Sequence, residues 1–284
     1  MTYAMNLPTG SERARASANI VFLGGGSITR ALVSGLKAAG HRPRLVVFDR
    51  HPEKLRSLRR DFDVEIARDL TAAMQYAGIL IIAVRPASCV KLLKEMSLRL
   101  DAGARPLQAV SLVVGIPLLK LRSALGSSVH WARAMPSPVC CIKRGLTAVC
   151  FDRNVSVAQR HRVRKLFSEV GTVIEIPERQ FDAFTVAYSP SYGYHALKSL
   201  AQAAQEAGLE RATALTVAAH AVGDAITYWR EIGFPNPAYL LKEAATPGGT
   251  AEATVAAMKR AGFDKIVAQG LRAGIQRARN YAKL

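Results

Sequence analysis

The residues best suited to chemistry near the start of the chain are three consecutive glycines, Gly24, Gly25 and Gly26, in the stretch IVFLGGGSITRAL. Glycines at a strand-to-helix turn let the backbone approach a pyrophosphate, and the following helix N-terminus offers amide donors. An apolar run precedes this turn and a helical pattern follows it, which is the context that such a motif requires. The spacing of Gly24 and Gly26 therefore predicts a dinucleotide-binding turn.

Asp49 and Arg50 follow a second apolar run, residues 44–48, and bear on which dinucleotide binds. A carboxylate in this place accepts hydrogen bonds from the adenosine ribose and repels a 2′-phosphate, which favours NAD. An arginine in the next position binds that phosphate, which favours NADP. Because the two residues indicate opposite preferences, the sequence leaves NAD and NADP both open.

A second pair of glycines lies in AATPGGTAEAT, residues 244–254. Pro247 has no amide hydrogen, and Gly248 and Gly249 tolerate positive φ, so the stretch predicts a break between two helices. Thr250 is expected to cap the second helix. The turn has two interpretations, which are an ordinary corner between helices and an anion site built from exposed backbone amides.

The elements that must position these turns follow from the alternation of apolar runs and helical patterns. Strands are expected at 18–24, 44–48, 64–67, 78–84 and 107–114, with helices between them. This alternation favours an α/β fold with a doubly wound parallel sheet. After about residue 178 helical spacing replaces the strand-like runs. We expect a flexible leader at 1–17, a dinucleotide-binding domain at 18–175 and an all-helical domain at 176–284.

The composition narrows the classes of partner. Half of the 284 residues are hydrophobic, which excludes wholesale disorder. Lys and Arg number 39 against 21 Asp and Glu, a net charge of +18 that suits anionic partners. These basic residues are spread along the chain, and only 7% of residues are aromatic, so little is available for stacking on bases. We therefore expect an acidic small molecule rather than nucleic acid.

The four cysteines bear on metal binding and on location. Their spacing matches no zinc pattern, and no secretory signal is evident, so we expect no metal and a cytoplasmic location with reduced thiols. They are Cys89, Cys140, Cys141 and Cys150. The longest apolar run, residues 79–84, is too short to cross a bilayer, so no membrane partner is expected.

Five stretches, in order and at matching intervals, resemble the pyrroline-5-carboxylate reductase family, and the resemblance runs from about Ala18 to the C-terminus. They are GGGSIT (24–29), AVRP (83–86), SLVVGI (111–116), RAMPSPV (133–139) and TPGGT (246–250). The resemblance implies a Rossmann domain, a helical dimerisation domain, and a homodimer or larger homo-oligomer. It also implies hydride transfer from NAD(P)H to the C=N bond of a cyclic imino acid, pyrroline-5-carboxylate, to give proline. Its motifs add to the expected cofactor site Ser27, Ile28, Ala83, Val84, Arg85, Pro86, Met135 and Pro136.

The resemblance also implies where the substrate binds. The turn after Pro247 would offer donors to the substrate carboxylate, namely Gly248, Gly249, Thr250 and Ala251. Tyr192 and Tyr194, in YSPSYGY, are alternative matches for a tyrosine of the family's substrate domain. Because a tyrosine can donate a proton or hydrogen-bond an imine nitrogen, we take Tyr188 of the same stretch, with Thr250, as the catalytic candidates. The alternative is that the three tyrosines pack an interface.

Three departures from the family pattern leave other functions open. Ala251 stands where the family has a second threonine, and Ser137 and Pro138 replace a polar asparagine–threonine pair. The helix after YSPSYGY places Leu200 or Lys198 where the family has an acid. One alternative is a reductase of a different cyclic or secondary imine. The other is a non-catalytic, cofactor-binding paralogue that acts through its helical domain.

Overall fold

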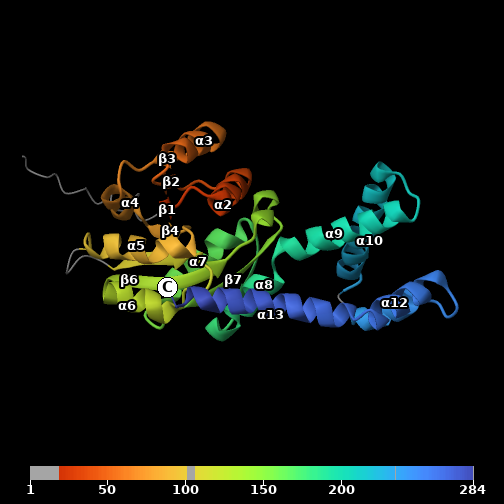
Figure 1. Ribbon diagram of the computed structural model, residues 1–284. Coiled ribbons are helices and arrows are strands. Elements are labelled where there is room, and N and C mark those ends of the chain that lie inside the picture. The colour runs from red at the N-terminus through yellow and green to blue at the C-terminus, as the bar shows by residue number, and fades with distance from the viewer. Residues whose placement is uncertain (1–18, 101–105, 234, 284) are drawn as a thin grey trace, which may run out of the picture. The chain divides into compact units, whose positions relative to one another are not determined.

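A computed structural model describes residues 19–100, 106–233 and 235–283, and the leader predicted at 1–17 lies outside these residues. Figure 1 shows a sheet flanked by helices, followed by a run of helices. The strands are β1 (Ile20–Leu23), β2 (Leu45–Phe48), β3 (Glu65–Ile66), β4 (Ile79–Ile82), β5 (Leu107–Ser111), β6 (Val129–Met135), β7 (Gly145–Phe151) and β8 (Gly171–Glu175). The helices of this part are α2 (Ser27–Ala38), α3 (Pro52–Phe62), α4 (Leu70–Tyr76), α5 (Pro86–Ser97), α6 (Leu118–Leu125), α7 (Val157–Ser168) and α8 (Phe181–Ala187). The later helices are α9 (Pro190–Glu206), α10 (Arg211–Glu231), α11 (Pro237–Ala244), α12 (Thr250–Arg260) and α13 (Phe263–Tyr281).

The sheet has the strand order β3-β2-β1-β4-β5-β6-β7-β8. The chain adds β2 and β3 on one side of β1 and then places β4 on the other side. The carboxyl ends of β1 and β4 therefore mark the switch in strand order where dinucleotides bind in doubly wound folds. The five predicted strands are present and parallel to their neighbours. The Rossmann-type α/β fold class is thereby confirmed.

One strand pair departs from the parallel arrangement, because β6 and β7 run antiparallel. Residues 136–144 connect them and include a short 3-10 helix, Pro138–Ile142. A parallel pair needs a crossover of about a dozen residues or more, whereas a shorter connection lets the chain turn back beside the strand it has left. The sheet is therefore mostly parallel, and β8 returns to the parallel arrangement beside β7.

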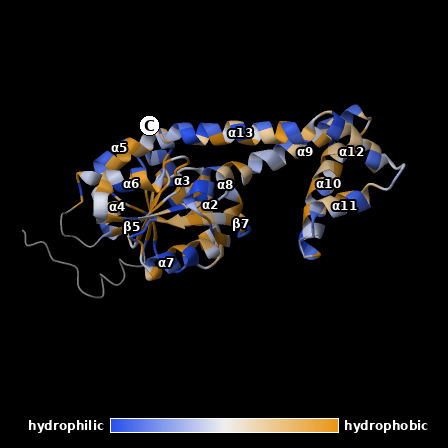
Figure 2. Cartoon of the chain, turned by 90° about the horizontal axis from the view of Figure 1, so that it is seen from below, coloured by the Kyte–Doolittle hydropathy of each residue, from blue (hydrophilic) through white to orange (hydrophobic). Residues whose placement is uncertain are grey.

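Two hydrophobic layers cover the two faces of the sheet. One layer packs α4, α5 and α6 against the strands and contains Leu80, Met96 and the fully buried Trp131. The other layer packs α2, α3 and α7 and contains Leu36 and Phe167. Figure 2 shows the hydrophobic residues concentrated along the strands. Burial of both faces explains why these strands read as continuous apolar runs rather than as alternating ones.

Contacts divide the chain into two compact units, one ending at Val186 and including Ile275–Leu284, the other spanning Ala187–Gly274. The sheet ends at Glu175, but Phe181 is fully buried in the core of the first unit. In the second unit α9 packs along α10. Among the residues that the structure describes, no helix has both the length and the apolar character needed to cross a membrane.

Candidate functional site

A cavity of about 280 Å³ lies at the carboxyl ends of β1, β2 and β4, where the strand order reverses. It is bounded by the glycine turn, by the start of α3 and by one face of α5. Its lining residues are Leu23, Gly24, Gly26, Ser27, Phe48, Asp49, Arg50, His51, Lys54, Ala83, Val84, Arg85, Ser88, Lys91, Leu92 and Glu95. This is the position at which doubly wound folds bind a dinucleotide.

The three glycines of the turn have different roles. Gly24 has φ +113°, and a Cβ atom there would lie 2.6 Å from the carbonyl oxygen of Ala83. The close passage of β1 past β4 therefore requires Gly24. Around Gly26, by contrast, a Cβ atom would meet no protein atom within 4 Å. The open space over Gly26, ahead of the N-terminus of α2, fits a pyrophosphate group.

Thr29 stands where dinucleotide-binding glycine motifs often have a third glycine or alanine. Its buried hydroxyl donates a hydrogen bond to the carbonyl oxygen of Gly24, at 2.5 Å. The side chain thus points back into the turn and fixes it.

Asp49 holds the turn through its carboxylate. Oδ2 accepts a hydrogen bond from the Gly25 amide at 2.7 Å, and Oδ1 accepts one from the His51 amide at 2.9 Å. Lys54 Nζ lies 3.7 Å from Oδ2. Although desolvation acts to raise the pKa of Asp49, these hydrogen bonds and the Lys54 charge outweigh it, so the pKa lies below its usual value. The carboxylate is therefore ionised at neutral pH and ties β2 to the glycine turn.

Positively charged groups dominate the rim of the cavity. Arg50 and Lys54 follow the end of β2. Arg85 stands just before α5, and Lys91 lies on the exposed side of that helix. Asp49 and Glu95 are the acidic residues among the lining residues described. The surplus of cations suits a ligand that carries several phosphates.

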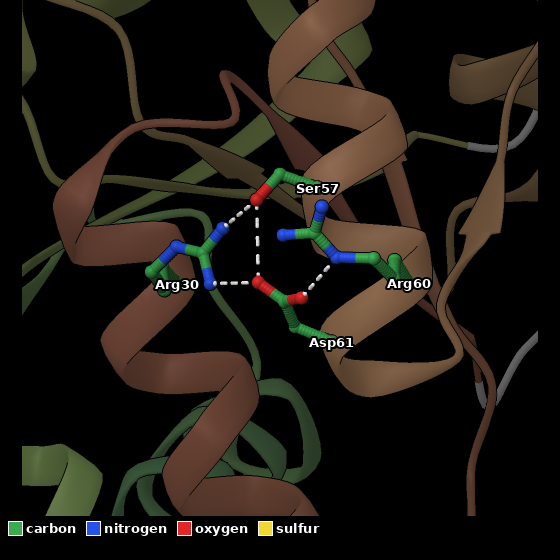
Figure 3. Close-up of polar contacts among 4 residues, drawn as sticks. All are labelled: Arg30, Ser57, Arg60 and Asp61. Atoms are coloured by element: carbon green, nitrogen blue, oxygen red, sulfur yellow. Dashed lines mark hydrogen bonds and ion pairs between the residues drawn. The ribbon is translucent and has the colours of Figure 1, made fainter.

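Polar contacts fasten α2 to α3 behind the glycine turn (Figure 3). Arg30 of α2 donates to Asp61 Oδ2 at 2.7 Å and also to the Ser57 hydroxyl. Arg60 donates to the other oxygen of Asp61 at 2.8 Å. Hydrogen bonds from Arg60 and Arg30 lower the pKa of Asp61 to about 2. These contacts fix the first turn of α2 relative to the second half of α3, the helix whose start lines the cavity.

The cavity contains most, but not all, of the predicted cofactor residues. The predicted residues that line it are Gly24, Gly26, Ser27, Asp49, Arg50, Ala83, Val84 and Arg85. The predicted residues absent from its lining are Ile28, Pro86, Met135 and Pro136. The Ile28 side chain packs against the core, and Pro86 opens α5. Met135 and Pro136 are buried at the end of β6. Cofactor contacts by these four residues stay predictions.

Sequence reasoning missed the contribution of α5. Ser88, Lys91, Leu92 and Glu95 line the cavity from this helix. Their spacing of three and four places them on one helical face, which is a pattern that the sequence contains. What the sequence lacks is the information that this face, rather than the core face with Cys89 and Leu93, meets the glycine turn.

The predicted substrate residues lie in the second unit. Gly249, and not Thr250, is the N-cap of α12, and Thr250 is its first residue. The Gly248 amide donates to Glu252 Oε2 at 2.7 Å, and the Gly249 amide donates to the Thr246 carbonyl oxygen at 2.9 Å. Two of the four predicted amide donors therefore already have partners within the chain. The amides of Thr250 and Ala251 lie in the first turn of α12 and so lack an intrahelical acceptor.

The three candidate tyrosines also belong to the second unit. Tyr188 is half-buried in the connection between α8 and α9. Tyr192 and Tyr194 lie on the first turns of α9, with 53% and 68% of their surface exposed. Their catalytic and substrate-binding roles stay predictions.

The fold and the cavity define the class of this protein, a Rossmann-fold dinucleotide-binding oxidoreductase with a helical C-terminal region. A family model described as "NADP oxidoreductase coenzyme F420-dependent" matches residues 19–104. A second model, described as "Pyrroline-5-carboxylate reductase dimerisation", matches residues 178–281.

Similar proteins identify the family. A pyrroline-5-carboxylate reductase of Corynebacterium melassecola is 30% identical, over 86% of this chain and 91% of the relative. One of Mycobacterium tuberculosis is 30% identical, over 92% and 96%. The solved structure of a pyrroline-5-carboxylate reductase from Coxiella burnetii has a TM-score of 0.82 and 25% identity, and covers 94% of this chain and all of that one. The chain belongs to the pyrroline-5-carboxylate reductase family.

Proposed function

We propose that this protein is an NAD(P)H-dependent reductase that converts pyrroline-5-carboxylate to proline by hydride transfer to the C=N bond. The observation that carries the proposal is the cavity at the ends of β1, β2 and β4, in a chain similar to named reductases along most of its length. When bound, the reduced nicotinamide supplies the hydride. The protein's own task is to bind both reactants and to orient them.

Named residues divide this task. The amides at the start of α2 and the open space over Gly26 hold the pyrophosphate, and Ala83 and Val84 border the cofactor from the end of β4. Thr250 and the amide of Ala251 bind the substrate carboxylate at the N-terminus of α12, where the helix dipole favours an anion. The Tyr188 hydroxyl oxygen accepts a hydrogen bond from the protonated imine nitrogen. Such a site supplies little acid catalysis, because an imine that is protonated before binding is already electrophilic.

A spectrophotometric assay tests the proposed reaction. We expect purified protein to oxidise NADPH or NADH, followed by absorbance, in the presence of pyrroline-5-carboxylate, with proline formed in equal amount. The same assay with a panel of other cyclic and secondary imines tests the alternative substrate class. Cofactor binding without turnover of any imine would contradict the proposal and favour a non-catalytic paralogue.

We also propose that the cofactor is NADPH rather than NADH. Both Asp49 oxygens already accept backbone hydrogen bonds within the turn, so this acid serves the protein's own structure. Arg50 and Lys54 line the cavity beside Asp49 and supply positive charge for a 2′-phosphate. Steady-state kinetics with NADPH and with NADH separate the two cofactors.

We further propose a homodimer formed through the helical region. In the described part of Ala187–Gly274 the buried residues are three alanines, Ala201, Ala214 and Ala218, which is too little for a core. Large apolar side chains are exposed there instead, including Leu215, Tyr228 and Ile266. Exposed apolar surface of this extent marks an interface. A location in the cytoplasm stays a prediction.

Hydrodynamic mass measurement tests the dimer. We expect the purified chain to run at twice its 30.6 kDa mass or at a higher even multiple in size-exclusion chromatography with light scattering. Substitution of Ile266 by Asp, on the exposed side of α13, should shift the protein toward monomer because it places a charge in an apolar interface. A wild-type monomer at micromolar concentration would contradict the proposal.

A further inference from the structure

The turn before α12 binds a carboxylate that belongs to the chain itself. Gly248 has φ +76°, a left-handed conformation, and its amide donates to Glu252 Oε2 at 2.7 Å. Glu252 lies in the first turn of α12, where the helix dipole stabilises a negative charge. The side chain therefore holds one oxygen against an amide of the very turn that is proposed to receive the substrate carboxylate.

A substrate carboxylate on this turn would meet that negative charge. The donors that remain for it are the Thr250 amide and hydroxyl and the Ala251 amide, within three residues of Glu252. Like charges held close together disfavour binding, and such contacts commonly reject one partner in favour of another. Because Gly248 and Glu252 are both exposed, water and salt screen the repulsion in part.

We propose that Glu252 is a specificity-determining residue, which weakens the binding of cyclic imines that carry a carboxylate and favours cyclic imines without one. This inference rests on the proposed reductase function and refines its substrate class. A protonated cyclic imine without a carboxylate carries a net positive charge, so the Glu252 carboxylate attracts it. Pyrroline-5-carboxylate is then turned over with a KM raised by Glu252.

The substitution Glu252→Gln tests the proposal with little change of shape. The glutamine carbonyl can still accept the Gly248 hydrogen bond, so the variant removes the charge and keeps the contact. Steady-state kinetics would be measured on the full chain at saturating cofactor, with pyrroline-5-carboxylate and with 1-pyrroline, which has the same ring without the carboxylate. We expect the KM for pyrroline-5-carboxylate to fall about fivefold, the order of a partly screened charge contact. The kcat should stay within about twofold, and the KM for 1-pyrroline should not fall. The fivefold ratio between the wild-type and variant KM values for pyrroline-5-carboxylate should shrink at high salt.

Glu243→Gln is the matched control. Glu243 is an exposed acid on α11, so this variant changes the net charge equally without altering the turn, and its KM values should equal those of the wild type. If Glu252 served only to cap α12, its substitution would lower the melting temperature without separating the two imines. If the wild type reduces these imines and Glu252→Gln changes the two KM values equally or not at all, the inference about Glu252 is overturned and the proposed function stands. Failure of the wild type to reduce either imine would instead contradict the proposed function, and the inference would fall with it.

Discussion

Replacing Gly26 with valine is expected to abolish cofactor binding while the protein remains folded. A Cβ atom at Gly26 would meet no protein atom within 4 Å, so the new side chain would project into space that the pyrophosphate needs. The backbone there is extended, with φ −80°, which valine adopts readily. As valine is a poor N-cap, we expect a loss of about 1 kcal/mol of stability. The dissociation constant for NADPH should rise at least about a hundredfold, equivalent to roughly 3 kcal/mol.

Calorimetric titration with NADPH measures this change, and thermal unfolding monitors the fold. Gly24→Ala is the contrasting variant, because φ +113° and the 2.6 Å approach to the Ala83 oxygen make any side chain there incompatible with the strand packing. It should lose stability far more than Gly26→Val. A folded Gly26→Val protein that binds NADPH with wild-type affinity would refute the assignment of the glycine turn.

Reversing the charge at Arg50 is expected to change the cofactor preference. With NADPH as the proposed cofactor, Arg50→Glu is expected to remove a charge-assisted hydrogen bond to the 2′-phosphate, of about 1.5–3 kcal/mol. The value of kcat/KM with NADPH should therefore fall roughly ten- to a hundredfold. With NADH, which lacks that phosphate, it should change less than about threefold.

The control for Arg50 must separate contact from general attraction of anions. Arg56→Glu provides it, because Arg56 is an exposed residue of the same helix as Lys54 but does not line the cavity. Both variants change the net charge equally, so a purely long-range effect would lower NADPH use in both. If Arg50→Glu lowers kcat/KM equally with NADPH and with NADH, Arg50 does not bind the 2′-phosphate.

The first half of the sheet could be predicted because its signals are local. Strands β1, β2 and β4 are apolar runs bounded by turn residues, and Gly24–Gly26 stands directly after the first of them. Strand β6 lacks such a signal, because VHWARAM contains His130 and Arg133. Arg133 is nevertheless only 3% exposed, since it pairs with Glu178 at 3.1 Å and stacks on Phe181. Those partners lie far along the chain, so the sequence next to β6 does not show why Arg133 is buried.

The sequence by itself determined the family, the Rossmann-type fold with its helical C-terminal region, and the glycine turn that lines the cavity. Each of these follows from residues that stand next to one another. Only the tertiary structure decided that Asp49 is held by the Gly25 amide, that α5 lines the cavity, and that Glu252 reaches Gly248. The physical reason is that a hydrogen bond depends on distance and direction in space. The register of β1 with β2 brings Asp49 to the turn, and the left-handed conformation of Gly248 aims its amide at Glu252.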